Sequence, residues 1–251
     1  CLELGARLAE PGEFTRRGFH PKEGDAVIAA DGGADSLENA GFRPHLVLGD
    51  MDSLQRAHPG SARLRFPRQK DLTDLALAIR LAQARGFTRF KLYGALGGRL
   101  DHSLANLQLL AGLAQKGYRG AIVTPGLTAF CVADGRLSLP PLPAGRLVSV
   151  FAWGGPASGV TLGGLKYPLS GARLRPEEPL GVSNEALGGP VSAEVLQGTL
   201  LVTVLEGTVQ EKRRTSPATA SDSSFSRRSM SISSASCARV RTRLCRGESI
   251  L

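Results

Sequence analysis

The sequence lacks any uncharged apolar run approaching the roughly 18 residues that a membrane-spanning helix needs. No charged segment followed by an apolar one opens the chain, as a secretory signal peptide requires. Aromatic residues make up only 5%, with a single Trp, but the apolar fraction of 42% suffices for the core of a globular protein of 251 residues. We therefore expect a soluble cytoplasmic protein with no membrane contact.

Cysteine is also scarce. The four residues, Cys1, Cys131, Cys237 and Cys245, show neither the paired spacing of a zinc site nor the density of a secreted disulfide scaffold. We expect reduced thiols without a catalytic or structural role.

Positive charge is concentrated at one end of the chain. Residues 211–251 contain nine Lys and Arg and three acidic residues, so this segment carries two-thirds of the formal net charge of +9. This segment is rich in Ser and Arg and has no apolar period, so we expect a disordered tail. Binding of RNA or an acidic surface through the tail is an alternative, although Phe225 is the only aromatic residue available there for stacking on bases.

Short apolar runs alternate with helical patterns in the first half of the chain. The runs that predict buried parallel strands lie at residues 25–31, 45–50, 90–95 and 121–124, with a shorter "RLRF" candidate at 63–66. Between them, "TDLALAIRLAQARG" predicts a helix that Thr73 caps and Gly86 ends. This alternating order predicts a parallel sheet covered by helices.

A second helix is predicted from about Asp101 to Lys116, with Gly117 as its stop. Its expected inward-facing residues are Leu104, Leu107, Ala111 and Ala114.

Carboxylates follow the ends of the predicted strands. Asp31 closes the first run, Asp50 and Asp52 close the second, and "QKDLTD" and "GALGGRLDH" precede the two helices. Because ligands bind outside the carboxyl ends of parallel strands, we expect these groups to converge on one rim. Several facing carboxylates without a His or Cys cluster favour Mg²⁺, which binds carboxylates, water and phosphate oxygens.

The same rim carries positive charge. Lys70, Arg99 and the N-termini of the predicted helices near Thr73 and His102 add positive potential there, and Gly32, Gly33, Gly97 and Gly98 allow close approach of backbone amides to an anion. The spacing is neither that of a Walker loop nor that of a dinucleotide fingerprint. A phosphate site of another kind is predicted.

Each of these residues also has a purely structural interpretation. Asp31 before two glycines is typical of a turn, and Asp50 with Asp52 is typical of an Asx turn. Asp71 and Asp74 are first-turn carboxylates of the kind a helix dipole favours, and a packed or capping role is common for a histidine such as His102.

Four motifs carry a family resemblance. "ADGGADSL", "GDMDSL", "QKDLTDLALAI" and "GALGGRLDHSLANLQLL", followed by "GLKYPL" and "GVSNEA", resemble thiamine pyrophosphokinase, also called thiamine diphosphokinase, over about residues 25–204. The segments around Cys1 and after Leu205 depart from the family pattern. The resemblance implies transfer of the pyrophosphoryl group of ATP to the thiamine hydroxyl, leaving AMP, with Mg²⁺ as cofactor.

The resemblance also implies the architecture. We expect an N-terminal three-layer parallel-sheet nucleotide domain, residues 1–124, that binds ATP, then an all-β sandwich domain, residues 125–210, that binds thiamine, and a homodimer with active sites between subunits. Short strand-like runs punctuated by Gly and Pro after residue 124 support the sandwich independently.

The resemblance assigns roles residue by residue. Asp50, Asp52 and Asp71 would bind magnesium, and Asp71 or Asp50 would accept the hydroxyl proton. The wider catalytic set is Asp50, Asp52, Asp71, Asp74 and Asp101. The predicted nucleotide-binding residues are Asp31, Gln69, Lys70, Thr73, Arg99, His102 and Asn106. Ser183 and Asn184 would contact thiamine, with Trp153 and Tyr167 as aromatic candidates that are equally explained as sandwich core.

Two alternatives to this function remain at this point. "LGDMDS" is similar to the Asp-x-Asp of a haloacid dehalogenase-type Mg²⁺-dependent phosphatase, which would release phosphate rather than AMP. A basic-tail RNA-binding protein would depend on residues after Gln210 and would be indifferent to Asp52→Asn.

Overall fold

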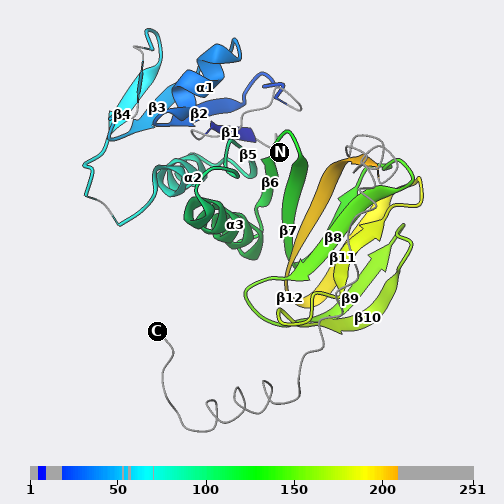
Figure 1. Ribbon diagram of the computed structural model, residues 1–251. Coiled ribbons are helices and arrows are strands. Elements are labelled where there is room, and N and C mark those ends of the chain that lie inside the picture. Colours follow the sequence, from blue (N-terminus) through cyan, green and yellow to red (C-terminus); the bar gives the residue numbers. More distant parts are fainter. Residues whose placement is uncertain (1–4, 10–18, 53, 56–57, 70, 209–251) are drawn as a thin grey trace, which may run out of the picture. The chain divides into compact units, whose positions relative to one another are not determined.

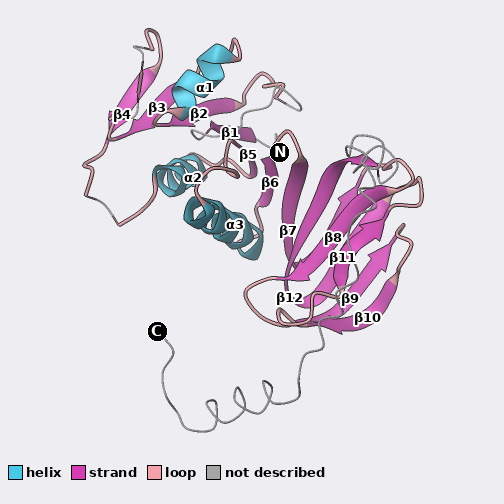
Figure 2. Cartoon of the chain, in the orientation of Figure 1, coloured by secondary structure: helices cyan, strands magenta, loops and turns pink. Residues whose placement is uncertain are grey.

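The computed structural model describes residues 5–9, 19–52, 54–55, 58–69 and 71–208. In this part of the chain it contains twelve strands and three helices (Figures 1 and 2). None of the described helices is long and apolar enough to cross a membrane. The predicted tail, residues 211–251, lies outside the described residues.

Six strands form a parallel sheet in the order β6-β5-β1-β2-β3-β4. Their bounds are β1 Gly5–Ala9, β2 Ala26–Ala30, β3 Leu46–Gly49, β4 Ala62–Arg65, β5 Arg89–Tyr93 and β6 Arg119–Val123. The four apolar runs and the shorter candidate at 63–66 therefore all form strands. The first three connections place β2, β3 and β4 on one side of β1, and the chain then crosses to β5 on the other side.

Alternate side chains of the strands face different helices. Ile28 of β2 belongs to a core with residues of α2 (Asp74–Ala84) and α3 (Leu100–Gln115). Its neighbours Val27 and Ala29 belong to a separate core with α1 (Gly33–Asn39). Because successive residues of a strand point to opposite faces, α1 covers one face of the parallel sheet and α2 and α3 cover the other.

The sequence analysis did not predict α1. This helix has only seven residues and begins at a glycine, so it offers less than the two turns that an apolar period needs.

The two predicted helices have the expected ends. The hydroxyl of Thr73 accepts a hydrogen bond from the Ala76 amide at 3.2 Å and so caps α2. Gly86 and Gly117 follow α2 and α3 with φ of +83° and +78°, the left-handed conformation that ends a helix.

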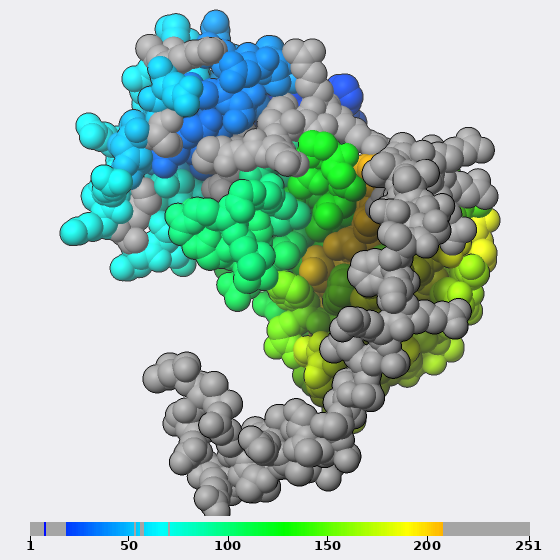
Figure 3. All heavy atoms as spheres, viewed as in Figure 1, coloured from blue at the N-terminus to red at the C-terminus, as the bar shows by residue number. Residues whose placement is uncertain are grey.

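The predicted inward face of α3 was partly wrong. Leu104 is 47% exposed, whereas Leu110 and Leu113 are buried against the sheet. Figure 3 shows part of α3 at the surface. Nearly all apolar positions of this helix fit an inward stripe, so the sheet rather than the sequence period decides which of them are buried.

The second half of the described chain is antiparallel and contains no helix among its described residues. Its strands are β7 Leu127–Leu139, β8 Arg146–Ala152, β9 Ala157–Gly163, β10 Leu169–Leu174, β11 Gly181–Glu185 and β12 Val191–Thr208. Two predicted runs, 191–198 and 199–207, form the single strand β12, with an irregular register between Val195 and Thr199. Up to Gln197 β12 pairs with β9, and from Leu200 onward it pairs with β8.

These strands enclose a core of their own, in which Val148, Val160, Leu200 and Val202 are buried. Strand β7 pairs with β6, so the parallel and antiparallel parts belong to one continuous sheet.

Candidate functional site

Two neighbouring strands, β2 and β3, bring the first carboxylates together. Asp31 follows β2, its amide donates to the carbonyl of Leu48 at 2.9 Å, and its Oδ1 accepts from the Met51 amide at 3.2 Å. Gly49, at the end of β3, has φ of +148° and lies directly against the Asp31 carboxylate. A side chain at residue 49 would occupy the position of that carboxylate, so glycine is required here.

The side chains of Asp31, Asp50 and Asp52 form a cluster. Each offers a carboxylate oxygen, and these three oxygens lie within 4.8 Å of one another. Asp31 and Asp50 are half-buried and Asp52 is exposed, so the cluster opens toward solvent. This set of hard oxygen donors fits Mg²⁺ or another hard divalent cation, with water and substrate oxygens completing its shell.

The environment raises the pKa of Asp31 to about 6. Burial is the largest cause, followed by a side-chain hydrogen bond with Asp74 and by repulsion from the charges of Asp74 and Asp50. The hydrogen bond from the Met51 amide acts in the opposite direction. In the absence of a cation, Asp31 therefore keeps its proton to a higher pH than a free aspartate does.

Asp50 and Asp52 also have the structural role considered above. The Asp52 amide donates to Asp50 Oδ1 at 3.2 Å, which is the hydrogen bond of an Asx turn. Oδ2 of Asp52 lies 3.2 Å from an Arg68 guanidinium nitrogen, and both side chains are largely exposed. The turn aims the two carboxylates at the same point, so the structural and metal-binding interpretations are compatible.

The "QKDLTD" motif is only partly at the cluster. Asp74, the first residue of α2, reaches Asp31 through their side-chain hydrogen bond. Asp71 is exposed and does not belong to the group of carboxylates within ligand distance of one another in the described chain. Gln69 is also exposed, Thr73 caps α2, and Lys70 lies outside the described residues.

The "GALGGRLDH" motif connects β5 with α3. Arg99 donates two hydrogen bonds to the carboxylate of Asp101, whose Oδ1 also accepts from the His102 amide at 3.0 Å. The Arg99 hydrogen bond is the main reason why the pKa of Asp101 falls to about 2, and the same bond raises the pKa of Arg99. Both side chains are exposed and form an ion pair at the start of α3.

His102 and Asn106, four residues apart, differ in their surroundings. His102 is exposed, whereas Asn106 is buried and its amide donates to the carbonyl of Ala95 at 2.9 Å. Asn106 therefore holds the loop after β5 in place.

The predicted thiamine segment lies on β11. Ser183 is exposed, has φ of +58°, and its amide donates to the Ser149 hydroxyl at 3.0 Å. Asn184 is buried, and its side chain exchanges two hydrogen bonds with the backbone of Tyr167, at 2.7 and 3.0 Å. The two residues thus differ, with Ser183 presented to solvent and Asn184 fixing the loop that carries Tyr167.

The two aromatic candidates also differ from each other. Tyr167 is 61% exposed, with the Lys166 ammonium 5.6 Å from its ring centroid. Trp153 is partly buried and packs against the core beneath α2 and α3.

Sequence reasoning missed one buried polar group near the cluster. Asp35 of α1 accepts from the Gln55 amide at 2.9 Å and lies 3.1 Å from Nε2 of His58, while Nδ1 of His58 lies 3.4 Å from Glu38. These contacts anchor the chain that follows Asp52. A lone histidine 23 residues from its partner offers no local signal of this pairing.

Comparison with known proteins places both halves of the chain in one family. The model of the thiamin pyrophosphokinase catalytic domain matches residues 21–122, and the model of the thiamin pyrophosphokinase vitamin B1 binding domain matches residues 136–200. A thiamine pyrophosphokinase of Bacillus subtilis is 26% identical over 181 residues, which cover 70% of this chain and 85% of that protein.

Structural comparison agrees with these matches. The crystal structure of thiamine pyrophosphokinase from Bacillus subtilis superposes with a TM-score of 0.73 at 23% identity, covering 80% of this chain and 98% of that one. The chain also matches the tRNA modification GTPase MnmE of Neisseria gonorrhoeae, 56% identical over 167 residues. That match covers 60% of this chain but only 33% of the GTPase, so it does not assign the activity of the GTPase to this chain.

Proposed function

Because the chain belongs to the thiamine pyrophosphokinase family and shares its transfer of a pyrophosphoryl group from ATP to thiamine, we propose that Asp31, Asp50 and Asp52 hold the Mg²⁺ for this reaction. The single observation that carries the proposal is the approach of three carboxylate oxygens to within 4.8 Å of one another. The metal assignment differs from the sequence prediction in one residue, since Asp31 takes the place of Asp71.

The metal would supply one kind of chemistry, the neutralisation of charge on the phosphate oxygens as the thiamine hydroxyl attacks the β-phosphorus in line. Asp50 and Asp52 would be held ready by their Asx turn, so little reorganisation is needed on binding. Asp31 would lose its proton when a cation binds, because the cation replaces that proton as the partner of its carboxylate.

The remaining motif residues are proposed to bind ATP and thiamine. Asp71 or Asp50 would accept the hydroxyl proton, and Asp74 would keep Asp31 in position. The Arg99–Asp101 pair, at the start of α3, would present a guanidinium to phosphate oxygens. Gln69, Lys70, Thr73 and His102 would complete the nucleotide site, with Asn106 supporting its loop.

We further propose that Ser183 contacts thiamine and that Asn184 and Tyr167 shape its pocket. The predicted domain boundaries after residues 124 and 210, the three-layer and sandwich architecture, the homodimer and the cytoplasmic location remain proposals. The phosphatase alternative has no support in the family matches, and the tail of the RNA-binding alternative lies outside the described residues.

Product analysis with ATP, thiamine and Mg²⁺ tests these assignments. The wild-type protein should form thiamine diphosphate and AMP in equal amounts, and Asp52→Asn should lower kcat by about 100-fold or more. The matched control is Glu177→Gln, which neutralises an exposed carboxylate far from the cluster in sequence and should leave kcat unchanged.

Three outcomes would contradict the proposal. Thiamine monophosphate with ADP would mean transfer of a single phosphoryl group, and phosphate release would favour the phosphatase. If Asp52→Asn kept the Mg²⁺ dependence of the wild type, the assignment of the metal site to this cluster would be wrong.

A further inference from the structure

The backbone at the carboxylate cluster has an unusual conformation. Among the described residues, four other than glycine have positive φ, and two of them, Asp31 at +41° and Met51 at +68°, lie at the cluster. This conformation has a steric cost for any L-residue, and the short polar side chain of an aspartate offsets part of it through local hydrogen bonds. Met51 has no such polar group, so another interaction has to hold its backbone there.

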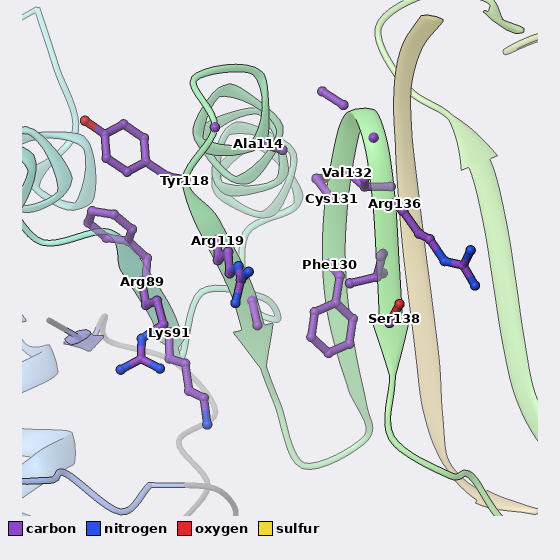
Figure 4. Close-up of a pocket in the computed structure, with 17 residues that line it drawn as sticks. Arg89, Lys91, Ala114, Tyr118, Arg119, Phe130, Cys131, Val132, Arg136 and Ser138 are labelled. Carbon is purple, nitrogen blue, oxygen red and sulfur yellow. The ribbon is translucent and has the colours of Figure 1, made fainter. Parts of the chain in front are cut away.

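A cavity elsewhere in the sheet does not supply that interaction. The cavity has a volume of about 580 Å³ and is formed by β5, β6, β7 and the end of α3, with the first residues of β5 and β6 in its wall (Figure 4). The cluster follows the last residues of β2 and β3, and a parallel sheet places those two ends at opposite edges. The shape of the cluster therefore depends on the loops after β2 and β3 and on the core that they contact.

The side chain of Met51 packs against an apolar core on the α1 face of the sheet, where it is partly buried. That core includes the buried residues Val27, Ala29, Leu37 and Val47, from β2, α1 and β3. A flexible thioether side chain adapts well to the irregular surface of a core. This packing offsets the cost of the positive φ of Met51.

Met51 also lies between two of the proposed metal ligands and contacts the third. Its amide donates to Asp31 Oδ1 at 3.2 Å, and the next amide, that of Asp52, donates to Asp50 Oδ1 at 3.2 Å. The φ of Met51 contributes to the angle between these two consecutive amides, and its packed side chain holds that φ. One apolar side chain thus affects the orientation of all three carboxylates.

We propose that Met51 is a positioning residue for the cation: its side chain, anchored in the core beside α1, holds the backbone that aims the three carboxylates at one point. This inference rests on the proposed function, in which those carboxylates bind Mg²⁺. A thioether is a poor ligand for a hard cation, so Met51 acts through its neighbours rather than on the metal. Loss of a group that orients metal ligands typically lowers metal affinity by roughly 10- to 100-fold.

Binding of Mn²⁺ alone, measured by electron paramagnetic resonance, tests this role without the reaction, because Mn²⁺ and Mg²⁺ bind the same kind of oxygen site. Met51→Gly separates the backbone from the side chain, since glycine adopts positive φ at no steric cost but loses the contact with the core. We expect Met51→Gly and Met51→Ala to bind Mn²⁺ about 10-fold or more weakly than the wild type. Met51→Leu keeps an apolar side chain of similar size and should bind Mn²⁺ within about 3-fold of the wild type.

Leu37→Val is the matched control. It shortens a buried side chain of the same core without changing the loop between the ligands, and it should bind Mn²⁺ as the wild type does. Melting temperatures in EDTA show that each variant folds.

The outcomes separate this inference from the proposed function. If Asp52→Asn bound Mn²⁺ as tightly as the wild type, the cation would lie elsewhere and the proposed metal site would be wrong. If Asp52→Asn lost Mn²⁺ but Met51→Gly bound it as the wild type does, the metal site would stand and the positioning role of Met51 would be refuted. Equal losses in Leu37→Val and Met51→Ala would also refute that role, because any loosening of the core would then suffice.

Discussion

Replacement of Gly49 by alanine tests the geometry of the carboxylate cluster most directly. A Cβ at this position would lie 2.9 Å from Oδ2 of Asp31 and closer still to its Oδ1 and Cγ. Ordinary contacts between heavy atoms are about 3.5 Å or longer, so the Asp31 carboxylate must withdraw by roughly 1 Å or more. The backbone adds strain, because φ of +148° is a conformation that essentially only glycine adopts.

These two effects have different consequences. The backbone strain alone should cost about 1–3 kcal/mol of unfolding free energy. The displacement of Asp31 should also weaken Mg²⁺ binding and lower kcat, since a misplacement of about 1 Å in a site can cost roughly 100-fold in rate. Gly49→Ala should therefore reduce stability by about 3 kcal/mol and kcat by about 100-fold at subsaturating Mg²⁺.

Gly86→Ala is the matched control. Gly86 also has positive φ, +83°, but a Cβ there would meet no atom within 4 Å. This variant should lose about 1 kcal/mol of stability and keep the kcat and Mg²⁺ dependence of the wild type. Urea unfolding measures the first quantity and a Mg²⁺ titration of initial rates the second. Wild-type kcat and Mg²⁺ half-saturation in Gly49→Ala would refute the placement of Asp31 in the metal site.

Three further predictions concern other residues around the cluster. In EDTA, the contribution of Asp31 to stability should fall as the pH rises from about 3.9 to about 6, because the unfolded chain loses this proton before the folded protein does. Urea midpoints of the wild type and of Asp31→Asn across this pH range measure the effect, and parallel pH profiles for the two proteins would contradict the raised pKa. Thr73→Ala should cost about 1 kcal/mol through loss of the α2 cap, and Thr73→Ser should recover most of it; equal urea midpoints for the two variants would exclude capping. His58→Phe should lower the free energy of unfolding in urea by about 2 kcal/mol, since Asp35 loses a buried partner. The variant should also raise the Mg²⁺ concentration for half-saturation by loosening the chain after Asp52. A variant as stable as the wild type would refute this anchoring.

Local signals in the sequence were sufficient for much of the fold. The apolar runs at 25–31 and 45–50 form β2 and β3. Helix α2 begins after Thr73 and ends before Gly86, as the capping preferences of these two residues predict. Such features depend on residues a few positions apart, so they can be recognised without knowing the rest of the structure. Even the rim position of the carboxylates follows from strand order, because parallel strands all end at the same edge.

The partners across the sheet were decided only by the tertiary structure. The sequence placed Asp31, Asp50, Asp52 and Asp71 at one rim without showing which of them meet. The pairing of β2 with β3 and the absence of a side chain at Gly49 bring Asp31 next to Asp50 and Asp52. The Asp35–His58 contact likewise depends on α1 packing beside the chain after β3, a contact between segments 23 residues apart.

Burial and strand continuity were also decided in three dimensions. The exposed Leu104 and the buried Leu110 are equally apolar in sequence, and only the position of α3 on the sheet distinguishes them. The runs at 191–198 and 199–207 form one strand because β7 pairs with both, across a glycine-containing irregularity that resembles a turn when the sequence is considered alone. Sequence thus determined which chemical groups this protein carries and near which strand ends they lie, whereas packing between distant segments determined which of them meet.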